Sequence, residues 1–224
     1  RSGTVEGVEA FTDFAAMLEA RPDIGTVSLC LPPQPRYPYA EAAIRAGRHV
    51  MLEKPPGQTL AEVHCLRALA DAFGVSLYAT WHSRMAAAVA PAKAWLAGRV
   101  VTSARIVWRE DVRKWHPGQD WVFEPGGMGV FDPGINALSI FTEIMPYPVF
   151  VEKAVLRVPA NRQTPVDVDI TFKSPARHKP RLTAGFNWLE ETGEIWTIAV
   201  ETRKGTKLKL EKGGTVRGGR GEEG

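Results

Sequence analysis

A glutamate and a lysine stand side by side where an apolar run ends, and their side chains could do chemistry there. Residues 49–52 form the run, Glu53 and Lys54 follow it, and two prolines come next. Because proline cannot donate to a β-ladder and favours extended geometry in the residue before it, we expect a strand that ends with Lys54 at its carboxyl edge. Ligands of open α/β sheets bind at that edge. The ammonium group could hold a substrate hydroxyl, share its proton or contact a cofactor phosphate; alternatively, both residues are solvated loop charges.

A carboxylate and an amide follow a glycine-rich stretch later in the chain. Asp132 precedes Pro133, and Asn136 comes four residues after Asp132 in an apolar helical pattern that runs through Met145. Residues at this spacing share one face of a helix, so we expect both side chains to project into one cleft. Two alternatives stay open. Asp132 could be a helix N-cap, since Pro133 suits the first helical position, and Asn136 could be a surface amide.

The elements that must position Lys54 alternate between helices and strands. Apolar periodicity predicts helices over residues 8–18, 39–46 and 59–73, and strands over 26–31, 49–52 and 75–79. Thr12 or Asp13 could cap the first helix, and Thr59 forms a capping box with Glu62. The prolines of residues 32–35 predict a rigid loop after a buried first strand. This order is typical of a doubly wound parallel sheet.

The second half of the chain has a different pattern. A helix is expected over residues 84–97, and alternation of apolar and polar residues predicts antiparallel strands over 102–109, 151–158, 166–172, 181–188 and 194–202. The basic tail from Arg203 to Arg220 predicts a strand pair and a loose end. We therefore expect a second, mainly antiparallel sheet that has one face wet or covered by a partner.

Composition limits the classes of function. With 224 residues, of which 44% are hydrophobic, the chain can bury the core of one large or two small domains. Its 28 basic and 25 acidic residues nearly balance, which argues against a nucleic-acid surface. The sequence contains no run of about 18 apolar residues and no signal peptide, so we expect no membrane role. Cys30 and Cys65 give neither a disulfide framework nor metal-ligand spacing, and a reducing cytoplasm fits them.

Three motifs together resemble those of the Gfo/Idh/MocA oxidoreductase family. They are AGRHVMLEKP at residues 46–55, the turn Leu31-Pro32-Pro33, and GGMGVFDPGIN at residues 126–136. The resemblance implies a truncated Rossmann-type, doubly wound parallel sheet over residues 1–83, which would bind NADP or NAD. It also implies a C-terminal α/β domain with an open, mainly antiparallel sheet over residues 84–224, through whose exposed face a homo-oligomer could form.

Further sequences are similar to those of one branch of this family, the bacterial L-arabinose and D-galactose 1-dehydrogenases. They are residues 80–84 (TWHSR), Glu110 with Trp115 and His116 after it, and Asn136 where many relatives have histidine. The resemblance implies NAD(P)-dependent oxidation of an aldose at C1 to the aldonolactone. It assigns Lys54 and Asp132 to the C1 hydroxyl, with Asp132 as the expected proton acceptor, although a neutral Lys54 could also take the proton.

The same resemblance implies two sets of binding residues. A carboxylate and an imidazole suit polyol recognition because each binds a hydroxyl in a fixed direction. The expected sugar-binding residues are Lys54, His82, Glu110, Trp115, His116, Asp132 and Asn136. The expected cofactor-binding residues are Arg1, Leu31, Pro32, Pro33, Glu53, Lys54, Trp121 and Asn136.

Several of these assignments have plain structural alternatives. Arg1 would pair with a 2′-phosphate, which favours NADP, or it is only a terminal charge. Glu110 and His116 could be loop residues bonded to backbone, and the tryptophans and His82 could belong to the core.

The chain departs from the family pattern at both ends. The glycine-rich phosphate turn and most of a second strand of the family pattern do not occur in this sequence, and we expect a C-terminal strand and closing helix to be missing as well. We therefore expect a fragment that binds a dinucleotide weakly or not at all. Because a fold does not fix a function, two other activities compete with aldose oxidation. One is non-catalytic sensing of a sugar or dinucleotide, and the other is oxidation of another polyol such as inositol.

Overall fold

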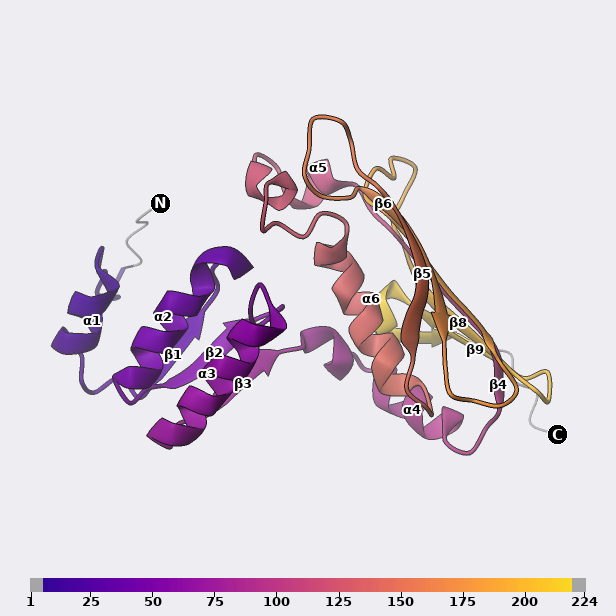
Figure 1. Cartoon of the computed structure of the whole chain (residues 1–224), viewed down its shortest axis with the longest axis horizontal. Coiled ribbons are helices and arrows are strands. Elements are labelled where there is room, and N and C mark those ends of the chain that lie inside the picture. Colours follow the sequence, from indigo (N-terminus) through magenta and orange to yellow (C-terminus); the bar gives the residue numbers. More distant parts are fainter. Residues whose placement is uncertain (1–5, 219–224) are drawn as a thin grey trace. The chain divides into compact units, whose positions relative to one another are not determined.

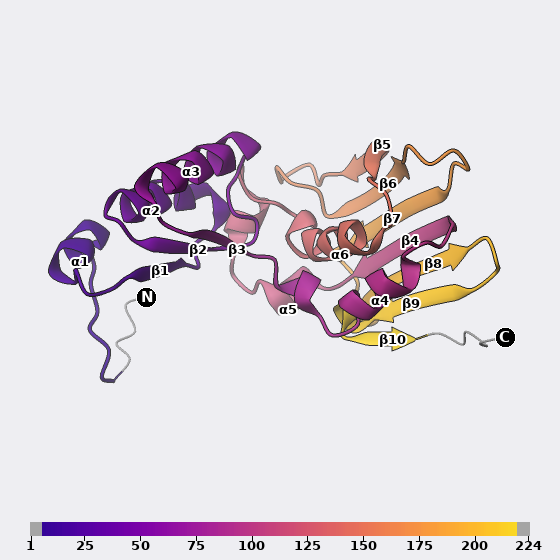
Figure 2. The ribbon, with the colours of Figure 1, turned by 90° about the horizontal axis from the view of Figure 1, so that it is seen from below.

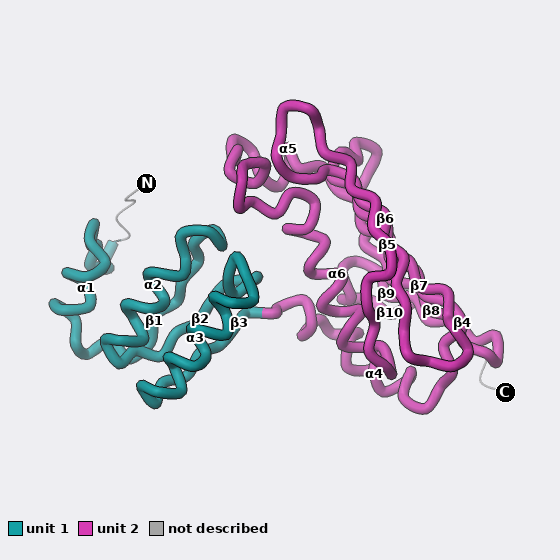
Figure 3. The backbone as a smooth tube through the Cα atoms, viewed as in Figure 1, with its two compact units in different colours: residues 1–80 teal, residues 81–224 magenta. Residues whose placement is uncertain are grey.

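A computed structural model describes residues 6–218 (Figure 1). The chain divides into two units, the first ending at Thr80 and the second beginning at Trp81 (Figure 3). The boundary expected after residue 83 falls within a short 3-10 helix, η1 (His82–Met85).

The first unit is built on a parallel sheet. Its strands are β1 (Thr26–Leu29), β2 (His49–Glu53) and β3 (Leu77–Thr80), in that order. The helices α2 (Pro33–Arg45) and α3 (Leu60–Phe73) lie on one side of this sheet (Figure 2), and α1 (Phe14–Ala20) precedes β1. Apolar side chains of α2 and α3 bury one face of the strands, with Ile44, Leu52 and Leu66 at most 1% exposed. The predicted parallel sheet is confirmed, and Lys54 directly follows the carboxyl end of β2.

Local capping signals in this unit act as predicted. The hydroxyl of Thr59 accepts a hydrogen bond from the backbone N–H of Glu62 at 3.2 Å, and the Glu62 carboxylate accepts one from the backbone N–H of Thr59 at 3.4 Å. Gly74 ends α3 with a φ of 66°, which is the left-handed region that glycine enters most easily. Asp13 caps α1 by accepting from the Ala16 N–H at 2.8 Å, and the helix begins at Phe14 rather than at residue 8.

Two other local predictions in this unit are wrong. Residues 33–35 are the first turn of α2 and not a loop. Because first-turn N–H groups have no partner within a helix, the missing N–H of a proline costs nothing there. In addition, β1 is not buried on both faces: Thr26 and Ser28 are exposed while Val27 and Leu29 are buried, since α2 and α3 cover one face only.

The second unit contains a seven-stranded sheet in the order β10-β9-β8-β4-β7-β6-β5. The helices α4 (Val89–Leu96) and α6 (Phe131–Ile144) pack against one face of it (Figure 1). The strands are β4 (Val101–Arg109), β5 (Phe150–Arg157), β6 (Asp167–Lys173), β7 (Arg181–Asn187), β8 (Ile195–Thr202), β9 (Lys207–Glu211) and β10 (Val216–Gly218). Besides η1, the unit contains the short helices α5 (Val112–Trp115), η2 (Asp120–Phe123) and η3 (Lys212–Gly214).

The mainly antiparallel sheet is confirmed, including the strand pair predicted for the basic tail, which is β9 with β10. One pairing differs from expectation, because β4 and β7 are parallel. Alternation of apolar and polar residues shows which side chains face the core, but it is the same for either strand direction. The expected helix over residues 84–97 is divided into η1 and α4, and the backbone N–H of Ala88 bonds to Gly214 O at 2.9 Å. Among residues 6–218, no helix has the length and apolarity needed to cross a membrane.

Candidate active site

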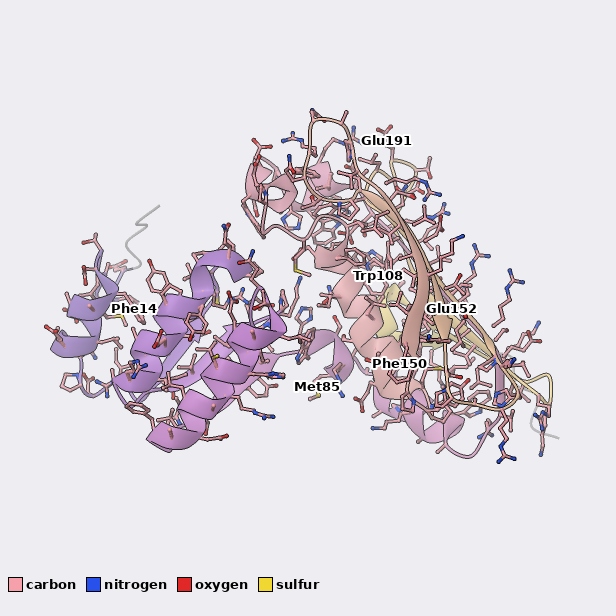
Figure 4. The ribbon with its side chains drawn as sticks, in the orientation of Figure 1. Phe14, Met85, Trp108, Phe150, Glu152 and Glu191 are labelled. Atoms are coloured by element: carbon pink, nitrogen blue, oxygen red, sulfur yellow. The ribbon has the colours of Figure 1, made fainter. Side chains whose placement is uncertain are left out.

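A cavity of about 360 Å³ lies within the second unit. It is lined by residues of η1, β4, α5, α6, β8 and η3, so six elements that are distant in sequence contribute to it. Six of the seven residues expected to bind sugar line this cavity, and the seventh, Lys54, belongs to the first unit. The lining residues are His82, Ser83, Trp108 (labelled in Figure 4), Glu110, Trp115, His116, Asp132, Pro133, Asn136, Trp196, Lys212 and Gly213.

The first two turns of α6 present Asp132 and Asn136 to this cavity. The two residues are four apart in the helix, and both are half-buried cavity residues, as their spacing predicts. The alternative in which Asp132 is the N-cap is wrong, because α6 begins at Phe131 and its N-cap is Val130. The backbone N–H of Asp132 bonds to Gly129 O at 2.9 Å, and Asp132 lines the cavity.

The glycines before α6 are required by close packing. A Cβ atom on Gly129 would lie 2.3 Å from Pro165 O, and one on Gly127 would lie 2.4 Å from Trp121 O. Gly129 also has a φ of 54°, which L side chains rarely adopt. The glycine motif therefore sets where α6 begins and, through that, where Asp132 stands.

His116 and Asp132 form a pair in the wall of the cavity. Nε2 of His116 lies 3.2 Å from Oδ2 of Asp132, and the two side chains are only 16% and 15% exposed. His116 is the residue that ends α5, where its backbone N–H bonds to Val112 O. The rings of Trp188 and Trp121 pack edge-on against the imidazole, with centroid distances of 5.3 and 6.3 Å. The imidazole is therefore held between aromatic side chains with one nitrogen facing the carboxylate.

The other nitrogen of the imidazole faces Gln119, a residue that the sequence did not single out. Oε1 of Gln119 lies 3.2 Å from Nδ1 of His116 and accepts a hydrogen bond from Nε1 of Trp121, also at 3.2 Å. Because an indole N–H can only donate, the Gln119 atom at this point is its oxygen, and Nδ1 must carry a proton to bond to it. With Nδ1 as the donor to Gln119, Nε2 is the nitrogen that faces the Asp132 carboxylate.

Glu110 lies at the floor of the cavity, just beyond the end of β4. Its side chain accepts two indole hydrogen bonds, from Trp188 Nε1 to Oε1 and from Trp196 Nε1 to Oε2, each 3.0 Å long. Glu110 is 5% exposed, and this burial raises its pKa above the ordinary value of 4.5, against the opposing effect of the two indole donors. An ionised carboxylate has about four lone-pair positions, and the two indole donors use two of them.

Tryptophan side chains form the apolar part of the cavity wall. Trp196 stacks on Trp108 with a centroid distance of 5.8 Å, and Trp115 packs against Trp196 at the same distance. The indole nitrogen of Trp115 is occupied by Glu194, at 2.9 Å. Trp121, which was expected near the cofactor, does not line this cavity and instead holds Gln119. Trp188 and Trp196 escaped sequence reasoning, because only strand pairing brings them next to Glu110. Trp108, which stacks on Trp196, escaped it as well.

The first unit carries Lys54 and most of the residues expected to bind the cofactor. Leu31, Pro32 and Pro33 follow β1, so they lie at the same sheet edge as Lys54. Glu53, also expected at the cofactor, turns its carboxylate towards its own strand end. Oε1 accepts from the Lys54 N–H at 2.9 Å, and Oε2 accepts from Thr80 Oγ1 at 3.3 Å.

Two further expectations concern Arg1 and the binding of a metal ion. Arg1, expected beside the cofactor ribose, lies outside the described residues. Within the part of the chain that the structure describes, no three His, Cys, Asp or Glu side chains gather in a way that could hold a metal ion.

The chain is similar to a known protein family and to several known proteins. Residues 4–81 match the family described as "Oxidoreductase family, NAD-binding Rossmann fold" (GFO_IDH_MocA). Galactose 1-dehydrogenase of Pseudomonas fluorescens is 43% identical over 214 residues, which are 94% of this chain and 67% of that protein. The crystal structure of a D-galactose-1-dehydrogenase protein from Rhizobium etli superposes with a TM-score of 0.91 at 51% identity, covering all of this chain and 72% of the other.

A more distant structure shows how widely this fold is shared. An inositol dehydrogenase homologue from Azotobacter vinelandii, solved with NAD⁺, has a TM-score of 0.79 at 16% identity over 95% of this chain and 60% of its own. At that identity the likeness concerns the fold alone. The family match, the 43% identical relative and the common architecture agree with one another, and the chain belongs to the Gfo/Idh/MocA family of oxidoreductases with an NAD-binding Rossmann fold.

Proposed function

We propose that this protein is an NAD(P)-dependent sugar dehydrogenase that oxidises an aldose, D-galactose or L-arabinose, at C1 to the aldonolactone. The observation that carries the proposal is the cavity of the second unit. The His116–Asp132 pair, Glu110 and Asn136 line it together with tryptophan rings. The 43% identity to a galactose 1-dehydrogenase supports the same substrate class.

The composition of the cavity suits a monosaccharide. Its volume of about 360 Å³ is at the lower end of the range for small-ligand sites. Carboxylate oxygens of Glu110 and Asp132 can accept hydrogen bonds from sugar hydroxyls, and the Asn136 amide can both donate and accept. The rings of Trp108, Trp115 and Trp196 offer apolar surface for the C–H groups of a pyranose.

The chemistry divides into a hydride transfer and a proton transfer. A bound nicotinamide supplies the hydride acceptor. Asp132 takes the proton of the C1 hydroxyl, and the imidazole of His116, whose Nε2 lies 3.2 Å from Oδ2 of Asp132, holds this carboxylate in place. The Lys54 ammonium orients the hydroxyl and favours the developing negative charge on its oxygen. Neither step needs a metal ion or a covalent enzyme intermediate.

The loops of the first unit fit a dinucleotide, because they follow neighbouring parallel strands at their carboxyl ends. We assign its binding there to Leu31, Pro32, Pro33 and Glu53. Trp121 and Asn136 are proposed as further cofactor-binding residues. Both NAD and NADP are proposed as cofactors. Arg1 is the residue proposed to bind the 2′-phosphate of NADP.

The test is to supply the full-length protein with NAD or NADP and a panel of D-galactose, L-arabinose and inositol, and to follow the absorbance of reduced nicotinamide. We expect reduction with an aldose and formation of the lactone. Lys54→Ala should lower turnover by at least about 100-fold, the usual scale for a lost acid–base or electrostatic group. Turnover with inositol alone would assign another substrate, and calorimetric sugar binding without nicotinamide reduction would replace catalysis by sensing.

We also propose that copies of the protein associate through the outer face of the seven-stranded sheet. Charged and polar side chains of both signs alternate there, among them Arg105, Asp169, Arg181 and Lys207 around an open depression. Light scattering of the intact protein reports the oligomeric state directly.

A cytoplasmic location is proposed from Cys30 and Cys65, which are both free thiols on the surface.

A further inference from the structure

Arg36 is a charged side chain buried in the first unit. It lies in the first turns of α2 and is only 1% exposed, although α2 borders the surface. Burial of a guanidinium costs free energy unless its N–H groups find hydrogen-bond acceptors. The acceptors that Arg36 contacts therefore indicate its role.

Backbone carbonyl oxygens receive the hydrogen bonds of Arg36, and they belong to two loops. Nε donates to Leu31 O at 3.0 Å, and Nη2 donates to the same oxygen. Nη1 donates to Glu53 O at 2.6 Å and also to Pro55 O. One guanidinium therefore joins the loop after β1 to the loop after β2.

The two carbonyls of the second loop belong to the residues on either side of Lys54. The Glu53–Lys54 peptide unit and the Pro55–Pro56 peptide unit are thus both tied to one rigid, planar group. From the opposite direction, the Lys54 N–H bonds to Oε1 of Glu53 at 2.9 Å, and Thr80 bonds to both Leu52 O and the Glu53 carboxylate. These contacts leave the Lys54 backbone little room to turn.

We propose that Arg36 is a positioning residue for Lys54, which sets the direction of the lysine side chain and links it to the Leu31 loop. This inference rests on the proposed function, because it assumes that Lys54 acts on the substrate. Arg36 reaches the reaction only through the backbone of residues 53–55 and the loop at Leu31. A lysine at position 36 would keep the charge, but its single ammonium cannot span three separate carbonyl groups in a fixed plane.

The experiment compares Arg36→Lys with a matched change in the same helix, Arg45→Lys. Arg45 is exposed and pairs with Glu41 one turn away at 2.7 Å, so its replacement should leave kcat within about twofold. For Arg36→Lys in the full-length protein we expect a fall in kcat of about 10- to 100-fold with KM for the sugar changed less than about threefold. Misplacement of a catalytic group by about 1 Å has effects of that size.

A double-mutant cycle separates positioning from general support of the fold. If Arg36 acts through Lys54, adding Arg36→Lys to Lys54→Ala lowers kcat no further, whereas independent effects multiply. Equal losses in both backgrounds would overturn the inference while leaving the proposed function intact. An undiminished kcat for Lys54→Ala would instead overturn the proposed function. Circular dichroism and thermal unfolding check that each variant is folded, and Arg36→Gln takes the place of Arg36→Lys in the same cycle if the latter does not fold.

Discussion

Nε2 of His116 lies 3.2 Å from Oδ2 of Asp132, although one residue ends α5 and the other stands in the first turn of α6. Residues 116–130, which include η2, separate these helices in the sequence, and just before α6 Gly127 packs closely against η2 and Gly129 against Pro165. The pair places an imidazole against the carboxylate that we propose as the proton acceptor.

Replacement of Asp132 by asparagine tests the acceptor itself. Asn is nearly isosteric but cannot take a proton from a hydroxyl, so kcat should fall by about 100-fold or more. The matched control is Asp120→Asn, because the Asp120 side chain is 77% exposed and outside the cavity. Steady-state reduction of the nicotinamide measures both variants. A loss of less than about threefold in Asp132→Asn would remove this residue from the proton transfer.

The role of Gln119 can be tested without touching the cavity. In Gln119→Leu the acceptor for Nδ1 of His116 is gone, and a hydrogen bond contributes about 1 kcal/mol, so kcat should fall about fivefold. Gln119→Glu retains a side-chain oxygen and should restore most of the activity. Comparison of kcat for the two variants, at equal thermal stability, decides the point. Equal activities in the leucine and glutamate variants would contradict an orienting contact to His116.

Glu110 should make stability depend on pH in a defined direction. Burial raises the pKa of Glu110 above 4.5 in the folded state. At pH values between 4.5 and this raised pKa, the Glu110 carboxyl therefore keeps its proton in the folded state and loses it in the unfolded state. The contribution of Glu110 to the free energy of unfolding is therefore largest at acid pH, and it falls as the pH rises through that interval. In Glu110→Gln this slope should be absent, which urea denaturation at several pH values will measure.

The same substitution has a pH-independent cost as well. Glutamine has one oxygen for the two indole donors, so either Trp188 or Trp196 loses its acceptor at a cost of about 1–3 kcal/mol. The difference between wild type and Glu110→Gln should thus be largest at acid pH and shrink as the pH rises. A difference that grows with rising pH would show that the carboxylate is more stable when ionised in the fold.

Gly129→Ala should destabilise the second unit strongly. The added Cβ would lie 2.3 Å from Pro165 O and the backbone has a φ of 54°, so we expect a loss of about 2–4 kcal/mol in the free energy of unfolding. Gly25→Ala is the control, since a Cβ there meets nothing within 4 Å and should change stability by less than about 0.5 kcal/mol. Urea denaturation compares them. Similar stabilities for the two variants would mean that the loop before α6 can move away.

Local signals in the sequence were sufficient for much of the fold. The end of β2 just before Lys54, the Thr59 capping box and the shared face of Asp132 and Asn136 were all predicted correctly. Each depends on residues at most four positions apart, whose relation follows from helix or strand geometry alone. The start of α2 at Pro33 was misjudged although it is also local, because proline is compatible with both a loop and a first helical turn.

Contacts between distant parts of the chain could not be predicted in this way. Glu110 is bonded to tryptophans 78 and 86 residues away, and Arg36 reaches Glu53 across 17 residues and a strand. The parallel pairing of β4 with β7 is of the same kind. By itself, the sequence determined the elements, the family motifs and the residue types available for proton transfer. Only the tertiary structure decided that indoles hold Glu110, that His116 faces Asp132 and that Arg36 brackets Lys54, because strand order and helix packing, which bring distant residues together, leave no local pattern.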